Sequence, residues 1–169
     1  MVSSPPDRRL FKGFLSHAHE DCRLFGRFWQ LLWPRLAIDS ELQFTFWRDV
    51  DLLVGECWQE RIRDAIAAAD FSLLLVSPAY LSRPFISEVE IPAILEDPAM
   101  LVMPVGLQQV DLARCDLQGL GACQIFRLQM PGEREGRFFS ELGGPNSARF
   151  CDALASQISA RCLAALSST

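Results

Sequence analysis

Residues 71–76 read FSLLLV, an almost continuous apolar run that Ser77 and Pro78 bring to an end. Such a run, bounded by a turn signal, is typical of a strand buried on both faces of a parallel sheet. The segment before it, Trp58–Ala69, repeats apolar residues at helical spacing. The stretch therefore predicts a central parallel strand that follows a helix along the chain.

The rest of the chain alternates strand and helix signals in the same way. Apolar runs predict strands at 10–15, 42–47, 71–76 and 100–107, with a short fifth at 124–128. Helical spacing predicts helices at 21–37 (with Asp21 as N-cap), 58–69, 84–96 (kinked or cut short by Pro92) and 148–165. This order predicts an α/β fold: a flavodoxin-like, doubly wound sheet of five parallel strands with helices on both faces.

Composition indicates one globular domain. The chain has 169 residues, 50% of them hydrophobic, and a formal net charge of −5. This much apolar material excludes a mainly disordered chain, and no apolar run approaches the roughly 20 residues that span a bilayer. Without a visible secretory signal, we expect a cytoplasmic protein with a disordered lead at 1–9 and a single domain at 10–166. The acidic balance argues against nucleic acid as a partner, and no membrane association is expected.

The cysteines and histidines form no metal-binding pattern. None of the six cysteines has C-x-x-C spacing, and both histidines, His17 and His19, lie near only one of them, Cys22. Structural zinc needs four clustered ligands, so no metal site is expected. Free, buried thiols in a reducing cytosol are the simpler interpretation.

In a doubly wound sheet, ligands bind outside the carboxyl ends of the strands. Here those ends are residues 16–21, 47–51, 77–80 and 106–109. The turn after the first strand, residues 16–19, contains no glycine, which excludes a dinucleotide redox site. A phosphate-accepting receiver domain is excluded because its paired acids and its lysine have no counterparts at these ends. A P-loop is absent as well.

One carboxylate falls on the core side of the helix predicted at 84–96. Stepping about 100° per residue from Ile86 places three apolar residues within roughly 80° of it. They are Val89, Ala93 and Ile94. Glu90 lies at about 40°, inside this stripe, and Glu88 at about 200°, on the opposite face. A buried acid is costly unless it is paired or used, so Glu90 is held by an arginine, lies on a wrongly phased surface stripe, or is functional.

Four sequence boxes follow one another in a fixed order. They are residues 14–17 with Asp21, residues 47–55 with Trp58, residues 73–78 with Tyr80 and Leu81, and residues 85–90. Together they resemble the Toll/interleukin receptor (TIR) domain of the bacterial kind, over nearly the whole chain. Phe85 stands where tryptophan is usual, and Arg83 stands where serine is frequent. Phe85 and Glu90 are five residues apart where many members have four.

The resemblance implies a TIR fold and cleavage of NAD+ at the nicotinamide–ribose bond, with Glu90 as the catalytic residue. NAD+ is then the substrate, and no cofactor is implied. Implied substrate contacts are Ser16, His17, His19, Asp49, Trp58, Ser77 and Phe85. A solvated loop for the two histidines, and core packing for the aromatic residues, are the plain alternatives.

The resemblance also implies partners. They are a second copy of the chain, bound through the BB loop at 48–57, and an effector or sensor protein in bacterial antiphage signalling. The alternative function is a non-catalytic TIR scaffold that assembles with itself or with other TIR domains. An acid on the core stripe favours the enzyme, because a scaffold has no reason to place Glu90 there.

One carboxylate suffices for this reaction. A glycosidase needs two because its alkoxide leaving group must be protonated. Nicotinamide leaves from a pyridinium as a neutral molecule, so a single carboxylate that faces the developing oxocarbenium charge can carry the step. The nucleophile that is seated decides whether ADP-ribose, a cyclic isomer or a conjugate is formed.

Overall fold

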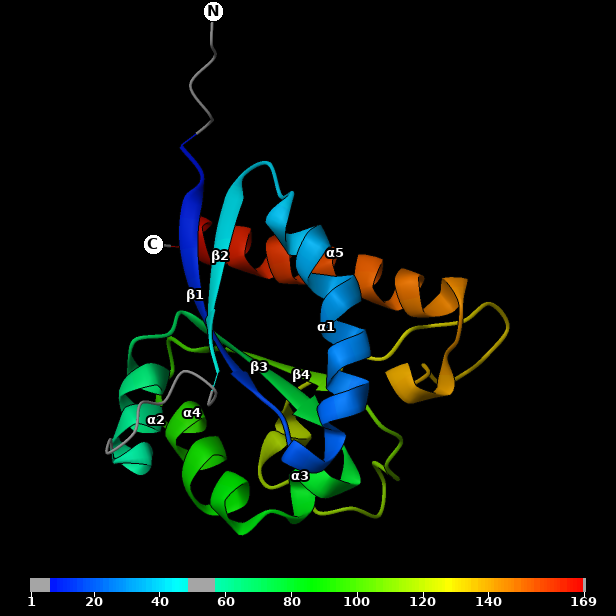
Figure 1. Cartoon of the computed structure of the whole chain (residues 1–169), viewed down its shortest axis with the longest axis horizontal. Coiled ribbons are helices and arrows are strands. Elements are labelled where there is room, and N and C mark those ends of the chain that lie inside the picture. Colours follow the sequence, from blue (N-terminus) through cyan, green and yellow to red (C-terminus); the bar gives the residue numbers. More distant parts are fainter. Residues whose placement is uncertain (1–6, 49–56, 169) are drawn as a thin grey trace, which may run out of the picture.

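A parallel sheet forms the centre of the molecule (Figure 1). The structure is a computed structural model that describes residues 7–48 and 57–168. Within these residues the sheet has four strands in the order β2-β1-β3-β4. They are β1 (Arg9–Ser16), β2 (Leu42–Trp47), β3 (Phe71–Val76) and β4 (Leu101–Gly106). Each neighbouring pair is parallel, which confirms the predicted α/β architecture.

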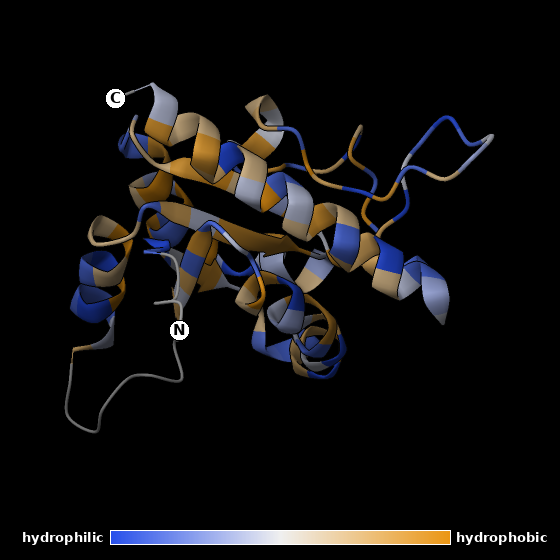
Figure 2. Cartoon of the chain, turned by 90° about the horizontal axis from the view of Figure 1, so that it is seen from above, coloured by the Kyte–Doolittle hydropathy of each residue, from blue (hydrophilic) through white to orange (hydrophobic). Residues whose placement is uncertain are grey.

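Helices cover both faces of the sheet. One face carries α1 (Cys22–Ala37) and α5 (Pro145–Ser167), and the other carries α2 (Trp58–Ala67), α3 (Pro78–Ser82) and α4 (Ile91–Glu96). Single turns lie at η1 (His19–Asp21), η4 (Leu120–Ala122) and η5 (Phe139–Glu141). Figure 2 shows mainly apolar strands between helices that carry both polar and apolar residues.

The central strand β3 divides the core into two halves. All six of its residues are buried, as the sequence predicts. Leu73 and Leu75 pack toward α1 and α5, whereas Leu74 and Val76 pack toward α2, α3 and α4. This division follows from the alternation of side chains along a strand. A strand buried in this way carries apolar residues on both faces, and Ser72 is the one polar residue of β3.

Gly13 lets β1 fit between its two neighbours. It lies opposite Phe46 of β2 and Phe71 of β3. A Cβ atom here would lie 2.6 Å from the Phe46 ring and 2.7 Å from the Phe71 ring. The two rings meet edge to face, with 5.3 Å between centroids, and fill the space that a side chain would need.

The prediction of a fifth strand at 124–128 is wrong for the described sheet. Phe126 makes a single parallel bridge to β4. Its N–H donates to the carbonyl of Pro104 at 2.8 Å, but Pro104 has no N–H with which to continue the ladder. Beyond the bridge, Leu128 exchanges two backbone hydrogen bonds with Arg137 instead of with β4.

The helix predicted at 84–96 contains a wider turn. Residues Ile86–Glu90 form a π-turn, in which the Ile91 N–H donates to the Ile86 carbonyl, and α4 continues from there. Pro92 lies in the first turn of α4. In an unbroken α-helix its ring would clash with the carbonyl four residues earlier, and it has no N–H to offer. The sequence predicts that Pro92 kinks this helix or cuts it short. In the structure the departure from a regular helix is a π-turn that directly precedes α4.

The wider turn changes the core stripe that regular helical spacing predicts. Val89 and Ala93, both expected in the core, are only half-buried. Ile91, which a regular α-helix turns away from Ile86, is fully buried. The predicted burial of Glu90 is confirmed, because 8% of this residue is exposed.

Asp21 occupies the N-cap position of α1, as the sequence predicts, but its side chain does not cap the helix. Its side chain makes no capping hydrogen bond to that helix and accepts a hydrogen bond from the Ser77 hydroxyl instead. Ser77 is itself an N-cap, because its Oγ accepts a hydrogen bond from the Tyr80 N–H at 3.0 Å. This cap begins α3, a short helix that directly follows β3.

Candidate functional site

The carboxyl ends of β1 and β3 lie side by side, because Ser16 pairs in register with Leu74. Ser16 is the last residue of β1, and its side chain points toward the π-turn that precedes α4. There the Ser16 hydroxyl donates a hydrogen bond to Glu90 Oε2, with 2.5 Å between the oxygens. Ser16 was predicted to lie at a strand end, and Glu90 was predicted on the core side of its helix. The structure shows that these two residues, far apart in the sequence, contact each other.

Burial makes this contact chemically significant. Ser16 is 4% exposed and Glu90 is 8% exposed. A hydrogen bond to a charged group in such surroundings is shorter and stronger than one between neutral groups. Because the serine occupies one carboxylate oxygen, the side chain of Glu90 is held in a fixed direction. Glu88, in the same π-turn, is exposed as predicted.

A second buried serine–carboxylate pair lies beside the first. Ser77 donates to Asp21, and both residues are buried. The pair joins the end of β3 to the turn η1, which follows β1. Because the Ser77 hydroxyl donates to Asp21 and accepts from Tyr80, its contacts in the structure hold two strand-end loops together. The predicted contact of Ser77 with substrate stays a prediction.

The Tyr80 side chain lies beneath these strand ends and is fully buried. Among the described residues, no partner meets hydrogen-bond geometry with its hydroxyl. Burial raises the pKa of Tyr80 far above its ordinary value; the negative charge of Glu90 raises it further, and Ser16 lowers it. Tyr80 therefore remains a neutral phenol close to the Ser16–Glu90 pair.

Two aromatic residues form a wall at the start of α2. The rings of Trp58 and Phe85 lie 4.3 Å apart between centroids and are tilted by 51°. Trp58 is 46% exposed and Phe85 is half-buried, so neither is a pure core residue. In contrast, Phe14 is 1% exposed and stacks on Trp47 at 5.4 Å, which is core packing.

The two histidines have different surroundings. His17 is half-buried and stacks on Phe25, with 4.0 Å between ring centroids. His19 lies in η1, is exposed, and meets His17 edge-on at 6.4 Å. The stacking of His17 fixes its ring beside the strand ends. Asp49, and residues 49–56 of the loop predicted to mediate self-association, lie outside the described residues.

One contact at this edge was not predicted from the sequence. Arg83 donates two hydrogen bonds to Glu20, at 3.0 Å and 2.9 Å. The guanidinium group of Arg83 lowers the pKa of Glu20. Exposed ion pairs leave no periodic signal in a sequence, and they contribute little to stability. This pair nonetheless joins η1 to the segment that leads into the π-turn.

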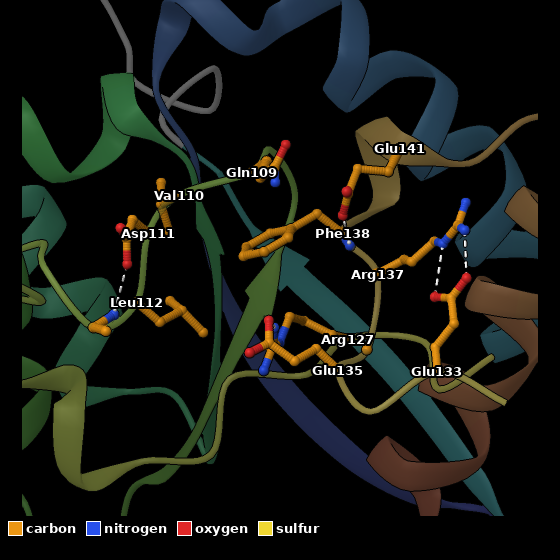
Figure 3. A pocket seen from close by; sticks show the side chains of 12 residues that line it. Gln109, Val110, Asp111, Leu112, Arg127, Glu133, Glu135, Arg137, Phe138 and Glu141 are labelled. Carbon is orange, nitrogen blue, oxygen red and sulfur yellow. Dashed lines mark hydrogen bonds and ion pairs between the residues drawn. The ribbon is translucent and has the colours of Figure 1, made fainter.

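A separate cavity lies beyond the carboxyl end of β4 (Figure 3). Its volume is about 960 Å³, and it is lined by residues of two loops. Arg137 is paired with Glu133 there, and Arg127 lies over the Phe138 ring at 5.6 Å. The lining contains none of the residues predicted to contact substrate.

The thiols and acids do not assemble into a metal site in the part of the chain that the structure describes. All six cysteines are free. Cys151 and Cys162 are buried, and burial raises the pKa of each thiol to about 12. The expectation of buried thiols is wrong for Cys22, Cys57 and Cys115, which are exposed.

A family model for the TIR domain matches residues 14–142. The chain belongs to the TIR domain family. The matched segment includes the carboxyl end of β1, the π-turn and β4, so it contains both members of the Ser16–Glu90 pair.

The family sets the range of functions to consider. TIR domains include enzymes that cleave NAD+ and scaffolds that assemble with other TIR domains, and self-association is common among them. Comparison with curated proteins finds no match. Across residues 7–48 and 57–168, no helix is long and apolar enough to cross a bilayer.

Proposed function

We propose that this TIR domain cleaves the nicotinamide–ribose bond of NAD+, with Glu90 as the catalytic residue. The observation that carries the proposal is the buried Glu90 carboxylate, oriented by Ser16 at the carboxyl ends of β1 and β3. Ligands of doubly wound sheets bind at such strand ends. A scaffold gains nothing from an acid held in this position, because burying a carboxylate is costly.

The proposed step needs one negative charge close to the ribose. The bond between C1′ and the pyridinium nitrogen breaks, and both electrons remain on nitrogen, so nicotinamide leaves as a neutral molecule. Positive charge then develops on the ribose ring, where the Glu90 carboxylate stabilises it. The hydrogen bond from Ser16 to Oε2 orients this carboxylate toward the site where the ribose is proposed to bind.

Capture of the cation completes the reaction. When water attacks C1′, it loses a proton to solvent and the product is ADP-ribose. A nucleophile within the same molecule gives a cyclic product instead, and a foreign nucleophile gives a conjugate. The aromatic wall of Trp58 and Phe85 is assigned to stacking on a flat ring of NAD+. His17 and His19 are assigned to the ribose or the phosphates.

Assembly belongs to the same proposal. The loop at 48–57 contacts a second copy of the chain, and the active form is this assembly. The nucleotide product then serves as a signal in bacterial antiphage defence, with a sensor or effector protein as partner. Clustering is then the trigger, and the dilute domain is expected to be inactive.

Paired glutamine variants test the assignment. Glu90→Gln keeps the size of the side chain but removes the charge, and it should lower the rate of nicotinamide release by about 10²–10³. Glu88→Gln, an identical change at an exposed position of the same π-turn, should release nicotinamide like the wild type. Both variants should melt like the wild type.

The outcomes separate the candidate functions. Normal cleavage by Glu90→Gln would remove Glu90 from the mechanism. Loss of activity in Glu88→Gln alone would show that the other acid is the catalytic one. If the clustered wild type releases no nicotinamide, the scaffold function replaces the enzyme.

A further inference from the structure

Phe85 and Glu90 are separated by an unusual step for two residues that serve one site. In a regular α-helix, five residues turn through about 500°, which leaves roughly 140° between the two side chains. Residues four apart lie on one face of such a helix. A regular helix would therefore direct the Phe85 ring and the Glu90 carboxylate to different sides.

The π-turn removes this difference. Its hydrogen bonds join residues five apart, so residues five apart lie one above the other. The Ile91 N–H to Ile86 carbonyl bond shows this directly. Ile86 and Ile91 are 4% and 0% exposed and share one core, although a regular helix would separate them. The same geometry brings Phe85 and Glu90 to one side.

Pro92 favours the π-turn over a regular α-helical turn at this position. An α-helical hydrogen bond from residue 92 to the Glu88 carbonyl is impossible, because proline has no N–H. The proline ring would also collide with that carbonyl. By lengthening the turn before it, the chain places Pro92 in the first turn of α4, where proline is tolerated. Turns of this kind are frequent at functional sites.

We propose that Pro92 is a positioning residue. By holding the π-turn, it directs the Phe85 ring and the Glu90 carboxylate toward the same substrate. The proposal rests on the proposed NAD+ cleavage for the identity of the substrate. Its structural claim is that Pro92 keeps the Glu90 side chain in hydrogen-bond contact with Ser16. The π-turn therefore compensates for the five-residue step between Phe85 and Glu90.

A point variant and a compensating deletion test the proposal. Pro92→Ala lets an α-helix continue, which turns Glu90 away from Ser16, and kcat should fall by about tenfold to a hundredfold with little change in KM. Deleting Val89 in the Pro92→Ala chain brings Phe85 and Glu90 to the four-residue step. This second change should restore most of the lost kcat, whereas damage to a merely structural proline would be made worse by a deletion.

The matched control is Pro84→Ala, which removes a proline from the start of the same helical segment. It should leave kcat, KM and the pH profile unchanged. A wild-type kcat in Pro92→Ala would overturn the proposal. So would a deletion variant that unfolds cooperatively at the wild-type temperature but stays as inactive as Glu90→Gln.

A measurement that needs no enzymatic activity distinguishes failure of this inference from failure of the proposed function. The effects of Ser16→Ala and Glu90→Ala on the free energy of urea unfolding should be non-additive in the wild-type chain, because each change removes one member of the shared hydrogen bond. The coupling free energy between the two changes should decrease in the Pro92→Ala chain. It should return to the wild-type value when Val89 is also deleted from that chain. If the wild type cleaves no NAD+, this mutant cycle still tests whether Pro92 maintains the contact between Ser16 and Glu90. Should the deletion variant not fold, an unchanged coupling in Pro92→Ala refutes the inference.

Discussion

Replacing Ser16 by alanine isolates the contact that orients the Glu90 carboxylate. The variant removes the hydroxyl that lies 2.5 Å from Glu90 Oε2, and Ser16 as a residue is 4% exposed. A hydrogen bond to a charged group contributes about 1.5–3 kcal/mol. A carboxylate that loses such a bond holds its proton to higher pH. At about 1.36 kcal/mol per unit, the acid limb of the kcat profile should move up by about one to two pH units.

The assay is nicotinamide release across the pH range for wild type and Ser16→Ala, together with the melting temperature of each. Ser77→Ala is the matched control, because it also removes a buried hydroxyl that donates to a carboxylate. It should lower stability through loss of the α3 cap without moving the acid limb. A Ser16→Ala variant with the acid limb and kcat of the wild type would refute the role given to this hydrogen bond.

Three further predictions concern the aromatic wall of Trp58 and Phe85, the packing of the core, and self-association. Trp58→Ala should raise KM for NAD+ far more than it lowers kcat, because ring stacking contributes about 1–3 kcal/mol to ground state and transition state alike; a fall in kcat alone would contradict stacking. Gly13→Ala should lower the free energy of urea unfolding by about 1–3 kcal/mol, because its Cβ would lie 2.6 Å from the Phe46 ring; an unchanged midpoint would contradict this packing. Specific activity should fall on dilution if subunits complete the site, and constant activity over about a hundredfold range would exclude that requirement.

The order of elements could be predicted from the sequence because each strand and helix carries its own period. β3 is an apolar run bounded by Ser77 and Pro78, and it is the fully buried central strand. The missing fifth strand could not be predicted from the apolar character of residues 124–128. The absence of this strand depends on Pro104 in β4, a distant part of the sequence. Pro104 has no N–H and therefore cannot continue the backbone hydrogen bonds between β4 and residues 124–128.

The candidate site was only partly accessible to the same reasoning. Helical phase predicted the burial of Glu90, and the strand-end rule predicted the neighbourhood of Ser16. The bond between them joins residues 74 positions apart, and no local period encodes such a pairing. The π-turn escaped prediction because it is a choice of backbone hydrogen bond, although Pro92 marked where the helix would depart from regularity.

Ser77 and Arg83 show two other limits of sequence reasoning. The contact of Ser77 with substrate, which the resemblance implies, stays a prediction, and the structure adds that its hydroxyl lies between Asp21 and the Tyr80 N–H. Arg83 pairs with Glu20 across two loops, and the sequence holds no signal for that contact. Side chains at strand ends serve both the ligand and the loops, so their position alone does not decide their role.

Chromatography of the products from concentrated wild-type protein and NAD+ tests the central claim most directly. We expect free nicotinamide in an amount equal to the NAD+ consumed, together with ADP-ribose or a cyclic or conjugated form of it. NAD+ that remains intact at protein concentrations where the chain self-associates would contradict the account.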